Sequence, residues 1–293
     1  MNGALNYVKV LGQQSKRKFG KVMLVEDQET NQQFILKTAT KSQISERALD
    51  QLRNEAAFSF QLERLPTVAL FEETESSISI LLNYKQGVPL NEFWKTIRKK
   101  DRLPFTKSFV SKLLFVLDHI HEQQIYHCDL KPSNILIDGT IESFEIHLID
   151  FGLAIDKKNI IERKLIFPLG FAAPELLLNR MHLINNTTDY FALGVMIYFL
   201  WSDELPLSHA NPSVFTNLQL AHPIQDHHSM PKRLNQWVQK LCVKPKWTTA
   251  PNLLSEDKVD ALLTTAIQER LQNSEEILRE LLIVKQRKWY FFK

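Results

Sequence analysis

In the first part of the chain, apolar and polar positions alternate, which is the pattern of half-buried strands. A helical segment interrupts this alternation, because apolar residues recur every fourth position over residues 42–65. Ser42 or Ser45 can cap this helix, and Pro66 marks its end. The alternation predicts strands at residues 7–12, 21–28, 32–39, 67–74 and 77–84.

After Gly87 the pattern becomes mainly helical. Helices are predicted at roughly 90–100 and 105–123, followed by short β segments at 134–138 and 144–150. After residue 175 the chain reads as helix and loop, and the apolar run at 190–201 reads as a buried core helix. That run has 12 residues, whereas a membrane span needs about 20.

The predicted fold class is therefore α+β, with a small β-rich lobe containing one main helix and a larger helical lobe. We assign residues 1–293 to a single domain, with the N-terminal lobe at 1–83, a hinge at 84–88 and the C-terminal lobe at 89–293. A cleft between two such lobes is a natural ligand site.

Composition indicates an ordinary globular protein, with 44% hydrophobic and 24% charged residues and a net charge of +3. Its basic clusters are short, so we expect solvated faces and no nucleic-acid partner. Cys128 and Cys242 are the only cysteines, which argues against a disulfide framework and for a reducing compartment. The N-terminal residues lack the charged leader and apolar block of a signal peptide. We therefore expect a soluble, cytoplasmic protein without a membrane span.

The stretch "YHCDLKPSNILI" at residues 126–137 carries candidate chemistry. Asp129 can orient a hydroxyl group and accept its proton, and Lys131 can neutralise a phosphoryl group in transfer. Asn134 offers an amide oxygen of the kind that Mg²⁺ accepts. Taken alone, the Asp–Asn pair also fits a polar turn. Further along, however, Asp150 follows an apolar strand in "LIDFG", and Glu175 closes "APE".

These motifs, in this order, resemble those of eukaryotic-type Ser/Thr protein kinases, from about Tyr7 to about residue 283. The resemblance implies a two-lobed kinase fold with ATP and Mg²⁺ as cofactors. In the catalytic loop, Asp129 would be the catalytic base and Lys131 the phosphate-contacting lysine. Asn134 and Asp150 would be the metal ligands.

The N-terminal lobe offers a charge pair that can be argued on physical grounds. Lys37 lies on an apolar strand, and Glu55 lies at the edge of the apolar face of the helix. A buried charge without a partner costs ~3–5 kcal/mol, so a mutual pair would resolve both. The resemblance places the Lys37 ammonium at the α- and β-phosphates of ATP. The alternative is two unrelated side chains whose charged ends reach solvent.

The resemblance also implies an apolar slot for adenine with hydrogen bonds from the hinge backbone. Any apolar residue of this slot could equally belong to the core. The residues that it assigns are Leu11 and Val22 as roof, Leu136 as floor, Leu82 as gatekeeper, and Asn83, Tyr84 and Lys85 as hinge contacts.

The phosphate loop departs from the family pattern. It keeps Gly12 and Gly20 but lacks the middle glycine, and it contains three cations at residues 16–18. Fewer glycines reduce close backbone approach to phosphate. The cations can compensate by direct attraction, or they can form a solvated hairpin tip. Ile35 stands where the family has alanine, and its bulk would narrow the adenine slot.

The activation switch of the family also looks absent. Cys128 replaces the arginine that follows His127, and residues 153–173 contain no Ser, Thr or Tyr. Without an acceptor hydroxyl or a receiving arginine, phosphorylation cannot order this loop. We expect it to be ordered by its own apolar residues, and activity to be constitutive or set by an activating partner protein. The residues proposed for that ordering are Ile160, Ile161, Leu165 and Ile166.

Four further expectations concern single positions. Cys128 can be a redox sensor or a small buried filler, and we favour the filler. Pro168 replaces a threonine that helps to hold the base in Ser/Thr kinases, which bears on substrate preference and rate. The resemblance also implies that Asp189 in "TTDYFALG" braces the catalytic loop, and that Glu175 pairs with an arginine near the C-terminus, for which Arg270 is the candidate.

The residues therefore favour an ATP-dependent protein kinase that transfers the γ-phosphoryl group to Ser or Thr of a protein substrate. One alternative is a catalytically weak pseudokinase that acts as a nucleotide-binding scaffold, and another is a kinase-fold phosphotransferase for small molecules. Residues 202–258 match no motif, and their histidines, His222, His227 and His228, can form a metal site or an ordinary surface loop. The C-terminal "KWYFF" is expected to be a docked tail, with a membrane-surface role as the alternative.

Overall fold

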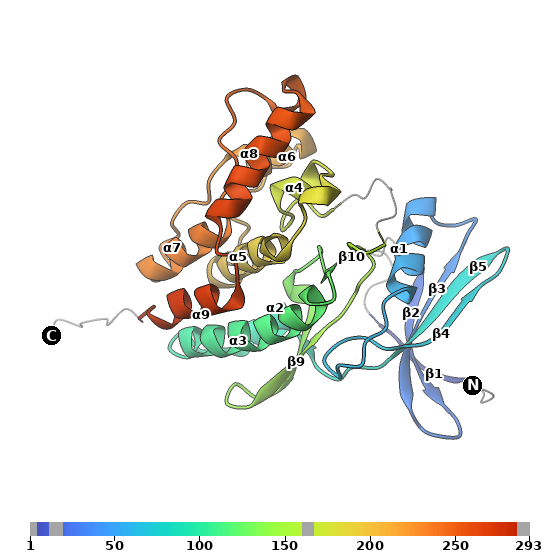
Figure 1. The fold of residues 1–293 in the computed structure, drawn as a ribbon. Helices are drawn as coiled ribbons and strands as arrows, with labels where there is room; N and C mark the ends of the chain where they lie inside the picture. Colours follow the sequence, from blue (N-terminus) through green and yellow to red (C-terminus); the bar gives the residue numbers. More distant parts are fainter. Residues whose placement is uncertain (1–4, 12–19, 160–166, 286–293) are drawn as a thin grey trace. The chain divides into compact units, whose positions relative to one another are not determined.

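A computed structural model describes residues 5–11, 20–159 and 167–285. Contacts between Cα atoms divide the chain into two compact units. Figure 1 draws their helices and strands as a ribbon coloured along the sequence. The first unit holds Met1–Val88, Leu136–Thr140 and Phe144–Ala154. The second holds Pro89–Ile135, Ile141–Ser143 and Ile155–Lys293. The chain therefore returns to the first unit twice after leaving it, and each unit is described separately below.

The first unit is built on a five-stranded sheet with the order β1-β2-β3-β5-β4. All neighbouring strands are antiparallel, as the alternating sequence pattern favours. Helix α1 (Glu46–Ala56) lies against β5. The strands are β1 (Leu5–Val10), β2 (Lys21–Asp27), β3 (Gln33–Thr40), β4 (Val68–Glu73) and β5 (Ser77–Asn83).

The two faces of this sheet carry separate clusters of apolar side chains. On one face, Ala39 and Ile80 pack with Leu49 and Leu52 of α1, and Ile35 joins this cluster. The other face packs a smaller cluster of Val25, Phe34 and Leu81. Because side chains alternate along a strand, Ile35 and Lys37 must share the face that α1 covers.

A smaller sheet has the order β6-β8-β9, formed by β6 (Val88–Pro89), β8 (Ile135–Gly139) and β9 (Phe144–Leu148). Gly87 precedes it with φ of +143°, a conformation that residues with a Cβ rarely adopt. A Cβ at Gly87 would also lie 2.9 Å from the carbonyl oxygen of Ile137. Only glycine therefore lets this part of the chain run so close to β8.

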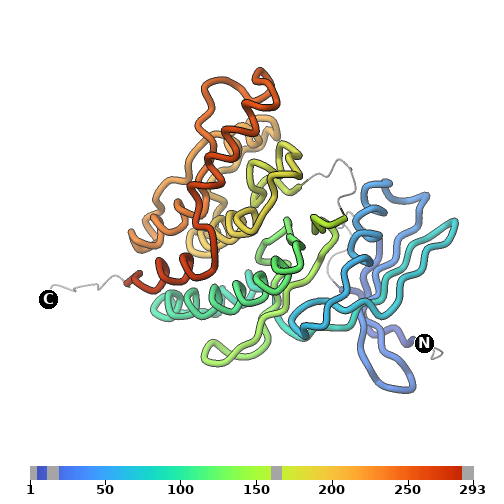
Figure 2. The backbone as a smooth tube through the Cα atoms, viewed as in Figure 1, coloured from blue at the N-terminus to red at the C-terminus, as the bar shows by residue number. Residues whose placement is uncertain are grey.

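The second unit is mainly helical and includes a short antiparallel pair, β7 (Ile125–Tyr126) with β10 (Ile155–Asp156). The tube in Figure 2 shows α3 in green and α9 in red running side by side, and the two helices are in contact. The helices are α2 (Leu90–Thr96), α3 (Arg102–His121), α4 (Pro174–Leu177), α5 (Asn186–Ser202), α6 (Pro212–Ala221), α7 (Lys232–Leu241), α8 (Glu256–Glu269) and α9 (Ser274–Leu282), with 3₁₀ turns at Pro132–Asn134, Met181–Leu183 and Pro251–Leu253.

The apolar run at 190–201 lies within α5, which is buried along most of its length. The expectation of a core helix is therefore confirmed. Asn185 caps this helix through a capping box with Thr188, so its start is defined by side chains as well as by burial. Within the described residues, no helix combines the length and the hydrophobicity that crossing a bilayer would require.

The fold class predicted from the sequence, α+β with one main helix beside the N-terminal sheet, is confirmed. The helix predicted at 42–65 was too long, because α1 ends at Ala56. Ser45 is its N-cap, as one of the two expected candidates. Beyond Ala56 the chain turns, and the ring of Phe60 packs at a tilt against that of Phe151, with 4.8 Å between the ring centroids. A continued helix could not make that contact.

The boundaries of two other helices also differ from the prediction. The helix predicted at 90–100 ends at Thr96, and the one predicted at 105–123 begins at Arg102 and ends at His121. The earlier start of α3, at Arg102, places Pro104 within the first turn of this helix. Proline is tolerated there because the amide groups of a first turn have no partner within the helix.

We predict that Gly194→Ala in α5 lowers the free energy of unfolding by about 1–3 kcal/mol, the usual range for overpacking. A Cβ at this position would lie 2.6 Å from Sγ of Cys242 and 3.0 Å from Cβ of Leu241. Urea denaturation measures the loss. In a double-mutant cycle, Cys242→Ala should recover part of it, because the closest clashing atom is gone. An equal loss in both backgrounds would contradict this explanation.

Candidate functional site

A buried ion pair in the first unit joins β3 to α1. Nζ of Lys37 lies 2.6 Å from both carboxylate oxygens of Glu55. Glu55 is 3% exposed and Lys37 19%. Burial raises the pKa of Glu55, Lys37 opposes the rise, and the negative charge of Asp150 adds to it. The contact expected between Lys37 and Glu55 is thus present, and Asp150 lies near enough to influence it.

The register of the sheet determines which side chains share a face with Lys37. Val22 is paired with Lys37, and Ile35 lies opposite Leu82. Directly paired residues point to the same side, so Val22, Ile35 and Leu82 lie on the Lys37 face. Ile35 also packs against the cluster beneath α1, which gives its branched side chain a role in the core. Its effect on an adenine slot stays a prediction.

The structure describes only part of the predicted phosphate loop. The N–H of Leu11 donates to the carbonyl of Val22 at 3.0 Å, which places Leu11 beside β2. Gly12 and the three cations at 16–18 lie outside the described residues. Gly20 approaches β3 so closely that a Cβ would lie 1.8 Å from the carbonyl oxygen of Thr38. Packing against β3 therefore explains this glycine, and its contact with phosphate stays a prediction.

The predicted hinge follows β5. The N–H of Asn83 donates to Thr67 at 3.0 Å, and the N–H of Tyr84 donates to Gln33 at 3.2 Å. Both amide groups are thus used within the first unit. Burial lowers the pKa of Lys85, with the charge of Glu63 opposing. Leu136 is half-buried on β8, where its Cβ would lie 3.0 Å from a Cβ added at Gly87.

Asp150 lies in a tight turn with φ of 68°, in the left-handed region that non-glycine residues seldom adopt. The N–H of Ala154 donates to the carbonyl of Phe151 at 3.0 Å and closes the following turn. Phe151 is fully buried and contacts the rings of Phe58 and Phe60. The backbone conformation at Asp150 is thus held by the packing of the residue after it.

In the second unit, the catalytic-loop motif forms one cluster. Nζ of Lys131 lies 2.6 Å from Oδ2 of Asp129. Nδ2 of Asn134 donates to the carbonyl oxygen of Asp129 at 2.9 Å and to its Oδ2 at 3.1 Å. Because the amide nitrogen of Asn134 faces Asp129, its Oδ1 is the atom that can face a cation. The three residues proposed for catalysis in this unit therefore lie together.

The predicted brace of this loop is confirmed by contacts of Asp189. Its carboxylate accepts the backbone N–H groups of His127 and Cys128, each at 2.9 Å. Nε2 of His121 lies 2.9 Å from Oδ2 of the same carboxylate. Burial works to raise the pKa of Asp189, but the contacts and charges of the two histidines and the Cys128 N–H hold it below its ordinary value.

His121 is a residue that the sequence analysis missed. It ends α3 in a helical pattern, and no sequence signal separates it from an ordinary core histidine. Cys128, like Asp150, is a non-glycine residue in the left-handed region, with φ of 59°. The hydrogen bonds that Asp189 accepts from the N–H groups of His127 and of Cys128 itself explain how this strained conformation persists.

The predicted pair of Glu175 with Arg270 is also confirmed. NH1 and NH2 of Arg270 donate to the two carboxylate oxygens at 2.7 and 3.0 Å, and both side chains are fully buried. Thr188 donates a further hydrogen bond to Glu175 at 2.9 Å, and Nε of Arg270 donates to the carbonyl of Val243 at 3.1 Å. Such complete pairing is what a buried charge pair requires.

Comparison with known proteins identifies the family to which the chain belongs. The model of the protein kinase domain matches residues 7–283. The chain belongs to the protein kinase family. Human serine/threonine-protein kinase D2 is 30% identical over 196 residues, which are 65% of this chain and 22% of that protein. Zebrafish (Danio rerio) maternal embryonic leucine zipper kinase is 35% identical over 144 residues, 47% of this chain and 20% of that protein.

Mouse Aurora kinase B is 24% identical over 241 residues, which are 80% of this chain and 68% of that protein. The chain thus spans only 22% of the length of the kinase D2 relatives that it matches. Motifs and contacts of the two units therefore belong to a kinase domain, and what the whole protein acts on is a matter for proposal.

Within this family, the chain departs at the residues that normally respond to phosphorylation. Cys128 is buried and, like Cys242, not in a disulfide. Burial, followed by the charge of Asp189, raises the pKa of the Cys128 thiol well above its ordinary value. This favours a buried filler over a redox sensor, because the reactive form of cysteine is the thiolate. The apolar residues 160, 161, 165 and 166, expected to order the activation loop, lie outside the described residues.

Residues 202–258, to which the sequence assigned no motif, contain α6, α7 and the start of α8. Among the described residues, no group of three or more His, Cys, Asp or Glu side chains is arranged to hold a metal ion. Nδ1 of His227 instead lies 2.7 Å from the hydroxyl of Ser229, and its ring packs at a tilt against that of His228. The "KWYFF" segment at the C-terminus falls outside the described residues.

We predict that neither cysteine of the folded protein reacts quickly with a thiol reagent. Burial raises the pKa of Cys242 to about 12, and Cys128 is shifted in the same direction. Ellman's reagent at pH 8 should titrate the two thiols only after unfolding in guanidinium chloride. A Cys242→Ala variant, which should release a single thiol, is the control. A fast reaction that maps to Cys128 would revive the redox interpretation.

Proposed function

We propose that this protein is an ATP-dependent protein kinase that transfers the γ-phosphoryl group to Ser or Thr of a protein substrate. The observation that carries the proposal is the cluster of Asp129, Lys131 and Asn134, held by a fully buried brace at Asp189. A polar turn without a function would not need a buried aspartate to hold its backbone. The Lys37–Glu55 pair supplies the second charged group that the reaction requires.

The proposed roles follow from the chemistry of each side chain. Asp129 orients the acceptor hydroxyl group and takes its proton. Lys131 and Asn134 both donate to Oδ2 of Asp129 and so hold its carboxylate in place. The ammonium group of Lys131 donates to Asp129 and would also contact the phosphoryl group during its transfer. Lys37 contacts the α- and β-phosphates, and Glu55 keeps its ammonium in place. Positioning and electrostatics provide most of the rate, as expected for phosphoryl transfer.

The residues fit Mg²⁺ as a cofactor. A carboxylate at Asp150 and an amide oxygen at Asn134 are both hard oxygen ligands. The nitrogen of the Asn134 amide is used by Asp129, and its Oδ1, which the hydroxyl of Ser133 contacts at 3.5 Å, is the atom that would ligate a cation. When bound, Mg²⁺ would neutralise phosphate charge. Asp150 and Asn134 are therefore the proposed metal ligands.

The residues also fit a nucleotide. Val22, Ile35 and Leu82 present an apolar surface on the same sheet face as Lys37. In the hinge, the N–H groups of Asn83 and Tyr84 are already bonded. Adenine would therefore take its hydrogen bonds from the carbonyl of Asn83 and from the backbone of Lys85. Leu11, Gly12, Gly20 and Leu136 complete the proposed nucleotide site.

The choice of a hydroxyl acceptor on a protein rests on the motif "DLKPSN" and on relatives that are named serine/threonine kinases. Pro168, in place of the family's threonine, favours a modest rate. Buried free cysteines fit a reducing compartment such as the cytoplasm. Because residues 153–173 lack an acceptor hydroxyl, activity is constitutive or set by a partner protein.

One alternative has a specific observation behind it. Pro168 and the divergent phosphate loop fit a weakly active pseudokinase that binds nucleotide and acts as a scaffold. The intact contacts of Lys37, Asp129 and Asn134 argue against it, since a scaffold has no need of them. An assay of phosphate transfer separates the two.

We predict that labelled γ-phosphate is transferred from ATP to a generic protein substrate in the presence of Mg²⁺. Asp129→Asn should lower the rate by about 10²–10⁴-fold, the usual contribution of a general base. Lys37→Met should abolish transfer and, because it leaves Glu55 buried without its cation, should also lower the free energy of unfolding by ~3–5 kcal/mol. Circular dichroism at the assay temperature shows whether the variant stays folded. Lys99→Met and Asp257→Asn, on exposed residues, are matched controls. Full activity of Lys37→Met or Asp129→Asn would refute the site, and phosphate found only on a metabolite would refute the protein acceptor.

We also predict that phosphatase treatment does not change the activity by removing a phosphate from the activation loop. Residues 153–173 contain no hydroxyl side chain that could carry the phosphate. Activity measured before and after treatment, with mass spectrometry of the peptides, tests this. A loss of activity traced to a phosphate in this segment would contradict the prediction.

A further inference from the structure

Three consecutive residues of α1 bind three different parts of the first unit. Successive residues on a helix point about 100° apart, so neighbours face different surroundings. Glu55 pairs with Lys37 on β3. Arg53 pairs with Glu73 at the end of β4. Asn54, between them, contacts the segment that follows Asp150.

The contact of Asn54 is made by its side-chain nitrogen. Nδ2 lies 3.2, 3.1 and 2.9 Å from the carbonyl oxygens of Phe151, Gly152 and Ala154. An amide NH₂ group has two hydrogens, so one of these hydrogens is shared between two of the three carbonyl oxygens. The surroundings also fix the orientation of the amide, because its oxygen at this place would face three carbonyl oxygens.

A second observation shows that α1 is built to lie against this segment. A Cβ at Gly152 would lie 3.3 Å from the carbonyl oxygen of Gln51, tighter than most real contacts. The glycine thus gives α1 room to approach. Asp150, two residues earlier, has its left-handed φ of 68°. A conformation of this kind persists only where neighbouring groups hold it.

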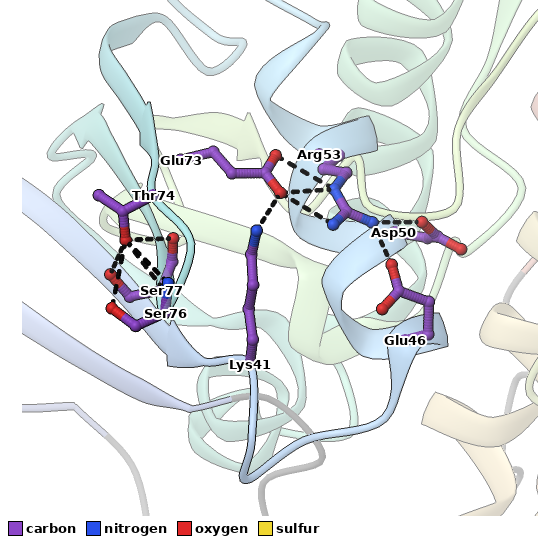
Figure 3. A network of polar contacts seen from close by, with 8 residues as sticks. All are labelled: Lys41, Glu46, Asp50, Arg53, Glu73, Thr74, Ser76 and Ser77. Carbon is purple, nitrogen blue, oxygen red and sulfur yellow. Dashed lines mark hydrogen bonds and ion pairs between the residues drawn. The ribbon is translucent and has the colours of Figure 1, made fainter.

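On its outer side, α1 is anchored to the sheet. Figure 3 shows Glu73 between Lys41 and Arg53, with Nζ of Lys41 at 2.7 Å and the guanidinium of Arg53 at 2.9 Å. Arg53 also contacts Asp50 at 2.8 Å and Glu46 at 2.5 Å on its own helix. Hydrogen bonds with Arg53 and Lys41 lower the pKa of Glu73 to about 2, so it stays charged at neutral pH.

The turn after Glu73 is ordered by its own polar groups. Oγ1 of Thr74 accepts the backbone N–H groups of Ser76 and Ser77 at 3.3 and 3.0 Å (Figure 3). The N–H of Lys41 in turn donates to the carbonyl of Ser76 at 2.9 Å. The anchor of Arg53 is therefore a fixed part of the sheet rather than a loose surface carboxylate.

We propose that Asn54 is a positioning residue for the kinase reaction, which holds the segment Phe151–Ala154 and thereby the metal ligand Asp150. With α1 tied to the sheet through Arg53 and Glu73, the amide of Asn54 fixes the segment relative to the Lys37–Glu55 pair. The inference rests on the proposed function for its catalytic consequence, but the contact itself can be tested without catalysis.

The catalytic test compares Asn54→Asp and Asn54→Ala with Arg47→Ala, an exposed position on the same helix. Asp keeps the size of the side chain but loses both donors and repels the carbonyl groups. We expect kcat to fall by about tenfold, the equivalent of one net hydrogen bond. The Mg²⁺ concentration for half-maximal activity should rise by about the same factor, while nucleotide affinity without Mg²⁺ stays unchanged. Lower activity with an unchanged Mg²⁺ requirement would show a merely structural role and overturn the proposal.

The second measurement is hydrogen exchange in peptides that cover residues 150–157. The amide of Ala154 should exchange about tenfold faster in Asn54→Ala than in the unsubstituted protein, and at the same rate in Arg47→Ala. Unchanged exchange in Asn54→Ala overturns the proposal. If the unsubstituted protein transfers no phosphate, the proposed function fails, and faster exchange still supports Asn54 as the residue that holds the segment.

Discussion

The first unit depends on a carboxylate buried under a sheet. Glu55 is nearly removed from solvent, and its charge is tolerable only because Lys37 of β3 lies within hydrogen-bond distance of both oxygens. This requirement determines more than one contact. It specifies the register of α1 over the sheet, and with it which residues of α1 point inward, outward and towards the turn after Asp150. Movement of α1 would leave two charges unpaired in an apolar setting, so the helix has little freedom once the pair forms.

In the second unit, Asp189 has the comparable role. Its buried carboxylate receives two backbone N–H groups from the loop and one contact from His121. Cys128, whose N–H is the second of these donors, has a left-handed conformation. The arginine that most kinases place there is thus replaced by a small side chain that fits the interior. The loop keeps its shape because its backbone is bonded, independently of the side chain at position 128.

Much of this could be predicted from the sequence, for physical reasons. Strand alternation located the sheet, since each strand has one face on the core and one elsewhere. The cost of unpaired buried charge correctly suggested the Lys37–Glu55 contact, and the resemblance to protein kinases suggested the Glu175–Arg270 pair. The end of α1 could not be predicted, because it depends on Phe60 meeting Phe151, a contact between distant parts of the chain. Asn54 was missed for the same reason, since its three partners are backbone carbonyl groups and leave no trace in residue type. Helix boundaries such as Arg102 shifted because proline is acceptable in a first turn.

The buried Glu175–Arg270 pair joins residues 95 positions apart in the chain. It closes the intervening stretch into a large loop whose two ends are tied together regardless of what lies between them. Lengthening a loop that is already long adds little entropic cost to its closure. An exposed connection in this stretch, such as residues 208–211, can therefore gain residues without disturbing the pair, whereas α7 cannot, because its Leu234, Trp237 and Val238 are buried.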